Sequence, residues 1–102
     1  MTSSAQKFHT IDELKLLVAP VAKKYGVGKV FLFGSVARGD HEDDSDYDFC
    51  IELGEIRGIE LGGFYMDLME AVGKETDLVD TESCKPDFLS RIMNESVLLY
   101  GE

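Results

Sequence analysis

A short, unbroken apolar run most constrains how this chain can fold. Residues 29–33 read Lys-Val-Phe-Leu-Phe, with Gly28 directly before them and Gly34 directly after them. An apolar run this short, bounded by glycine, predicts a strand that is buried on both faces. Because such a strand must be covered on each side, the rest of the chain has to supply elements that pack against it.

An amphipathic helix is predicted before this strand. Thr10 and Glu13 have the spacing of a capping box, which marks a helix start. The apolar side chains that follow recur with the helical period at Leu14, Leu17, Val18, Val21 and Tyr25. Pro20 conflicts with this helix because it lacks a backbone donor, so we expect a kink near Ala19. Glycine at 26 and 28 ends the helix.

Strands and helices alternate along the rest of the chain. The sequence predicts strands over 48–53 and 76–80, a loop over 55–63, a helical stripe over 61–72 and a last helix from Pro86. In the last helix we expect the apolar side chains to face inward, at Phe88, Leu89, Ile92 and Met93. The form of residues 97–100 stays open. This order predicts an α/β (α+β) fold, a small mixed β-sheet flanked by helices.

Length and charge limit the function. The 102 residues suffice for one domain, placed at 1–102 with residues 1–8 frayed. Acids outnumber bases twenty to ten, for a net charge of −10, which disfavours direct binding to nucleic acid or to anionic membranes. Two cysteines are too few for a disulfide framework, and no apolar run reaches membrane-spanning length. We therefore expect a cytoplasmic protein.

Residues suited to phosphate and metal binding follow the buried strand. Gly34 permits a tight turn, and Ser35 offers a hydroxyl at the start of a short helix whose amides suit a phosphate. Asp46 and Asp48 alternate at the next strand, which places both carboxylates on one face about 6–7 Å apart. Such oxygen ligands suit Mg²⁺. Arg38 could hold a triphosphate, although a surface ion pair is the simpler reading. On residues alone, a serine-capped turn and a solvated acidic loop remain alternatives.

Together these residues resemble a known family signature. Gly-Ser, ten residues and then Asp-x-Asp match the pattern of the DNA polymerase β-like nucleotidyltransferase superfamily. The fuller string Gly-Ser-x-Ala-Arg-Gly, followed by Ser-Asp-x-Asp, is similar to its minimal branch. That branch is the MNT-domain proteins, whose best-known members are antitoxins of HEPN–MNT toxin–antitoxin pairs. The motif covers residues 33–51, whereas size and element order agree over the whole chain.

The resemblance implies a nucleotidyltransferase fold and a role for each matching residue. Gly34, Ser35, Arg38 and Ser45 would bind the nucleotide. Three acids, Asp46, Asp48 and Asp77, would be catalytic and would hold two Mg²⁺ ions. Asp77 lies in Glu-Thr-Asp-Leu-Val-Asp, where threonine replaces the family's usual aliphatic residue. Asp80 falls on the opposite strand face from Asp77, so we take Asp77 as the third acid.

The resemblance also implies a reaction and a partner. The expected function is an antitoxin that transfers AMP from ATP to a tyrosine hydroxyl of a cognate HEPN ribonuclease toxin, in a hetero-oligomer with that toxin. One alternative is an antitoxin that inhibits by direct binding with little or no catalysis. Another is a small-molecule nucleotidyltransferase that works with a separate substrate-binding subunit. A homodimer through an uncovered sheet edge also stays open.

Overall fold

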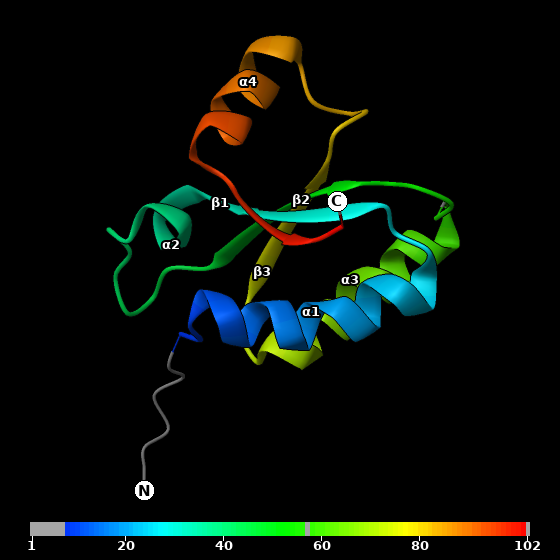
Figure 1. The fold of residues 1–102 in the computed structure, drawn as a ribbon, viewed down its shortest axis with the longest axis horizontal. Coiled ribbons are helices and arrows are strands. Elements are labelled where there is room, and N and C mark those ends of the chain that lie inside the picture. Colours follow the sequence, from blue (N-terminus) through cyan, green and yellow to red (C-terminus); the bar gives the residue numbers. More distant parts are fainter. Residues whose placement is uncertain (1–7, 57, 102) are drawn as a thin grey trace, which may run out of the picture.

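Helices and strands alternate along the chain, as the sequence predicts. The computed structural model describes residues 8–56 and 58–101, and Figure 1 shows how the elements are arranged. The helices are α1 (Ile11–Tyr25), α2 (Gly34–Arg38), α3 (Ile59–Val72) and α4 (Pro86–Glu95). The strands are β1 (Lys29–Phe33), β2 (Tyr47–Glu52), β3 (Thr76–Asp80) and β4 (Val97–Tyr100).

The strands form one mixed sheet in the order β3-β2-β1-β4. β1 is antiparallel to both β2 and β4, and β2 is parallel to β3. The predicted mixed sheet with flanking helices is therefore confirmed. β4, which the sequence left open, is an edge strand whose partner β1 lies far earlier in the chain. Its form depends on that long-range pairing and not on a local pattern.

The two faces of the sheet are covered unequally. α1 and α3 lie side by side on one face, and α4 lies on the other (Figure 1). The first face holds the core, which includes Leu14, Val18, Val30, Leu32, Tyr47, Phe49, Ile51, Phe64 and Leu68. On the second face, Phe31 and Phe33 of β1 are only partly buried. The expectation of burial on both faces is thus wrong for that side, since only the short α2 and α4 cover it.

The start of α1 agrees with its sequence signature. The amide of Glu13 donates to Thr10 Oγ1 at 3.1 Å, and the amide of Thr10 donates to Glu13 Oε1 at 2.8 Å. The helix continues through Pro20 and ends at Gly26, which has a φ of 73°. Of the segment expected to fray, residues 1–7 lie outside the described residues. Phe8 does not fray: its ring packs edge-on against Tyr47, with 5.5 Å between centroids.

Two predictions on the other helices need correction. α3 begins at Ile59, so part of the predicted loop is helical. In α4, Ile92 is buried as expected, but Phe88 is 41% exposed, because the first turn of that helix borders an open cavity. Within the described ranges, no helix combines the length and the apolar character that crossing a membrane requires.

Candidate active site

The turn after β1 requires glycine. Gly34 directly follows β1, is buried and has a φ of +78°. A Cβ added at this position would lie 3.0 Å from Cγ of Asp48 and closer still to one of its carboxylate oxygens. The turn brings the backbone directly against the Asp48 carboxylate. Only glycine fits both this close approach and the positive φ. Half-buried Ser35 follows, and its carbonyl accepts the amide of Gly39 at 2.9 Å, closing α2.

Two of the predicted acids lie on neighbouring strands. Asp48 is the second residue of β2 and Asp77 the second of β3, and the parallel register sets them directly opposite each other. Their side chains therefore share one face of the sheet, the face that carries α4. Asp46 lies just before β2 and is exposed. The structure thus places Asp48 between the Gly34 turn and Asp77.

The charges around Asp48 are not balanced. Burial, followed by the neighbouring carboxylates of Asp77 and Asp46, raises the pKa of Asp48 to about 6. Arg38 opposes this rise only in part. A group of carboxylates that repel one another is a donor set suited to a hard divalent cation such as Mg²⁺. Among the described residues, no three His, Cys, Asp or Glu side chains already lie close enough to enclose a metal ion.

Glu95 is a site neighbour that the sequence analysis missed. It ends α4, and its Oε2 accepts the amide of Gly34 at 2.8 Å and Nη1 of Arg38 at 3.1 Å. Arg38 also donates through Nε to Asp40 at 3.1 Å, so the ion pair considered from the sequence is present. No motif could identify Glu95, because it lies 57 residues from Arg38 and joins it only through the packing of α4 on α2.

Two other polar residues, Ser45 and Asp80, form hydrogen bonds within local turns. The Ser45 hydroxyl accepts the amide of Glu42 at 2.9 Å, which occupies it within the loop before β2. The Asp80 carboxylate accepts the amide of Ser83 at 2.8 Å and its hydroxyl at 3.1 Å. Asp80 therefore caps the turn after β3, while Asp77 faces Asp48. Of these two acids of β3, Asp77 is therefore the one that lies opposite Asp48.

Comparison with known proteins assigns the family. Residues 17–102 match the family model described as "Polymerase beta, Nucleotidyltransferase". The chain belongs to the polymerase β nucleotidyltransferase family. The Gly34 turn and the facing carboxylates of Asp48 and Asp77 are thus features of a nucleotidyltransferase chain.

Relatives and a solved structure agree with this family. A protein of Methanocaldococcus jannaschii named "Putative protein adenylyltransferase" is 36% identical over 88 residues, covering 85% of this nucleotidyltransferase chain and 95% of the relative. The protein adenylyltransferase MntA of Thermococcus cleftensis is 29% identical over 96 residues, covering 86% and 94%. A crystal structure of a toxin–antitoxin with AMP-PNP has the same fold, with a TM-score of 0.71, 22% identity and coverage of 88% and 73%.

Proposed function

We propose that this chain is an antitoxin nucleotidyltransferase that transfers AMP from ATP to a tyrosine hydroxyl of a cognate HEPN ribonuclease toxin and thereby inactivates it. The observation that carries the proposal is the pairing of Asp48 with Asp77 beside the Gly34 turn. Relatives named as protein adenylyltransferases support AMP as the transferred group and a protein as the acceptor. The resemblance to MNT-domain antitoxins supports a toxin as that protein.

Each site residue has a role in this reaction. Gly34 and Ser35 would hold the terminal phosphates, with Arg38 and Ser45 as further contacts to the nucleotide. Three carboxylates, Asp46, Asp48 and Asp77, would hold two Mg²⁺ ions, which when bound would offset the charge of the transferring phosphate. The acceptor oxygen bonds to the α-phosphorus as the bond to pyrophosphate breaks. Pyrophosphate leaves with the bonding electrons, and the hydroxyl proton passes to the Asp77 carboxylate.

The proposed reaction takes place within a complex of the chain and its toxin. The chain works in the cytoplasm as a hetero-oligomer with its toxin, and it binds ATP without direct contact to nucleic acid or membrane. Its net charge of −10 suits a basic, RNA-binding partner through complementary charge.

Intact-mass measurement of the toxin tests the proposal. The toxin encoded beside this chain is incubated with the chain, ATP and Mg²⁺, and a gain of one or more AMP masses is expected. Asp77→Asn should abolish the gain, since it removes a carboxylate at the reacting centre. Asp12→Asn is the matched control, because it changes the same residue type at an exposed position of α1, away from the carboxylates. EDTA should also abolish the gain.

Other outcomes would point elsewhere. Loss of ribonuclease activity with no change in toxin mass would contradict AMP transfer and favour an antitoxin that acts by binding. AMP recovered on a small molecule, with the toxin unmodified, would favour the small-molecule nucleotidyltransferase. Equal transfer by the Asp77→Asn and Asp12→Asn variants would show that Asp77 is not part of the active site.

A further inference from the structure

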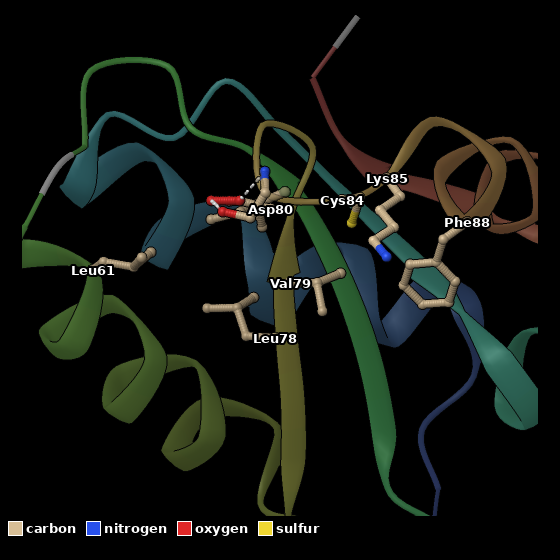
Figure 2. A pocket seen from close by; sticks show the side chains of 9 residues that line it. Leu61, Leu78, Val79, Asp80, Cys84, Lys85 and Phe88 are labelled. Carbon is tan, nitrogen blue, oxygen red and sulfur yellow. Dashed lines mark hydrogen bonds between the residues drawn. The ribbon is translucent and has the colours of Figure 1, made fainter.

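An open cavity lies beside the outer strand of the sheet. It has a volume of about 510 Å³, within the range of about 300 to 1,000 Å³ that is typical of ligand sites. Figure 2 shows Val79, Cys84 and Phe88 on one side of β3, and Leu61 and Leu78 on the other. Because β3 is the end strand of the sheet, the cavity is accessible from outside the sheet edge.

The cavity adjoins the carboxylates. Asp77 and Val79 alternate along β3 and therefore share a face, about 7 Å apart along the strand. A second hollow, lined in part by Asp77, shares Leu61 and Leu78 with the cavity. The two hollows therefore meet at Leu61 and Leu78, and the second one reaches Asp77.

The geometry of phosphoryl transfer sets the side from which an acceptor arrives. This step rests on the proposed function. The Gly34 turn, where the leaving phosphates would bind, lies at the end of β1, and Asp48 and Asp77 follow on β2 and β3 in sheet order. In-line transfer requires the attacking oxygen to approach opposite the leaving pyrophosphate. The acceptor must therefore come from the side of β3, where the cavity lies.

We infer that this cavity binds the aromatic ring of the acceptor tyrosine and directs its hydroxyl towards Asp77. A phenol joins an apolar ring to a polar tip, and the apolar walls of the cavity adjoin, at Leu61 and Leu78, the hollow that Asp77 lines. Phe88 is 41% exposed on the cavity wall, so a ring that packs on it gains burial without displacing any core contact. A serine or threonine hydroxyl has no ring to fill this space. The cavity therefore selects the acceptor class.

The kinetics of a wall variant test the inference. Phe88→Ala should raise the KM for the toxin about fivefold to tenfold, as expected for loss of an aromatic contact, and should leave the KM for ATP unchanged. Phe88→Leu should restore part of the loss. Leu16→Ala is the matched control, because Leu16 is 77% exposed on α1, on the face of the sheet away from the carboxylates. Equal KM values for the toxin in both alanine variants would overturn the inference.

Thiol protection tests the cavity without any transfer reaction. Cys84 lines the cavity and is half-exposed, whereas Cys50 is fully buried and serves as the internal reference. N-acetyl-tyrosine amide should slow alkylation of Cys84 by iodoacetamide in a concentration-dependent way, and N-acetyl-serine amide should not. If the two amides act alike, the inference is overturned whatever the transfer assay shows. If only the tyrosine amide protects while no toxin is modified, the cavity assignment stands and the proposed function fails.

Discussion

Gly34 shows how one residue can be fixed by two separate constraints. Its φ of +78° and the nearby Asp48 carboxylate both exclude a side chain. Gly34→Ala should therefore destabilise the fold by more than about 2 kcal/mol, since the strain of a left-handed residue adds to a clash. Gly39→Ala isolates the first cost, because Gly39 has a φ of +84° with nothing within 4 Å of an added Cβ. It should cost only about 1 kcal/mol. Urea unfolding measures both, and equal losses would contradict the close approach to Asp48.

The negative charge of Asp48 should lower the free energy of unfolding of the protein. Burial and the nearby acids raise its pKa from 3.8 to about 6, so the folded protein holds the proton more tightly than the unfolded chain. Stability is therefore lost as the pH rises from about 4 to 6, and the loss is complete above that range. In EDTA at pH 7.5, Asp48→Asn should stabilise the protein by about 1–2 kcal/mol, after allowance for solvent screening.

The pH dependence of this gain provides its own check. Thermal unfolding of both proteins should show the advantage of Asp48→Asn shrinking as the pH falls from 6 towards 4. Asp44→Asn, in the exposed loop before β2, is the control and should change stability by less than about 0.5 kcal/mol at every pH. If Asp48→Asn is no more stable than the parent at pH 7.5, the charge of the Asp48 carboxylate does not destabilise the folded protein.

At this scale, the sequence predicts residues whose role depends on local spacing. Their alternation makes Asp46 and Asp48 candidates, as does the place of Gly34 after a buried strand, and the family resemblance gives all three their predicted roles. Asp77 needed the family resemblance, because a lone acid on a short strand has no distinguishing pattern. Glu95 could not be found at all, since its contact with Gly34 depends on how α4 packs against α2.

Among the elements, α4 packs on the second face of the sheet and contacts the Gly34 turn through its last residue. Its last residue, Glu95, bonds to the Gly34 amide and to Arg38, and its side chain is 31% exposed. Glu95→Ala should cost about 1–2 kcal/mol in urea unfolding, because a buried amide loses a charged partner. Asp40→Ala is the control: Asp40 also pairs with Arg38 but is 62% exposed, so about 0.5 kcal/mol or less is expected. Equal effects would mean that Glu95 does not anchor the turn.

Elements are predictable where their signals are local. The capping box and apolar stripe of α1 and the glycine-bounded run of β1 each identified an element from a few adjacent residues. β4 could not be assigned, because four apolar residues become a strand only when β1 is beside them. The predicted inward position of Phe88 is wrong for a similar reason, because helical periodicity gives the face on which a residue lies but not whether a neighbour covers that face.

The whole molecule brings together parts of the site from distant segments. The Gly34 turn follows β1, the acids lie on β2 and β3, and Glu95 ends α4 immediately before β4. The sheet order sets these parts in a row, from the Gly34 turn at the end of β1 to Asp77 on β3. The residues to which the proposed function assigns the phosphates and the metal ions therefore lie in one row, provided that β1 and β2 stay in register.

β4 should be needed for that register. It pairs with β1 on the side opposite β2 and buries Leu99 to 5% exposure, so it covers an edge of the central strand and a part of the core near α1. Deletion of residues 97–102 should remove the cooperative thermal transition followed by circular dichroism. Loss of a strand partner and of a buried leucine should together lower the free energy of unfolding by more than about 3 kcal/mol, which is a large part of the stability of a small domain. Deletion of residues 101–102 alone is the control and should preserve the transition. If the longer deletion still unfolds cooperatively near the parent temperature, β1 and β2 hold their register without β4, and the site depends only on the three strands that carry it.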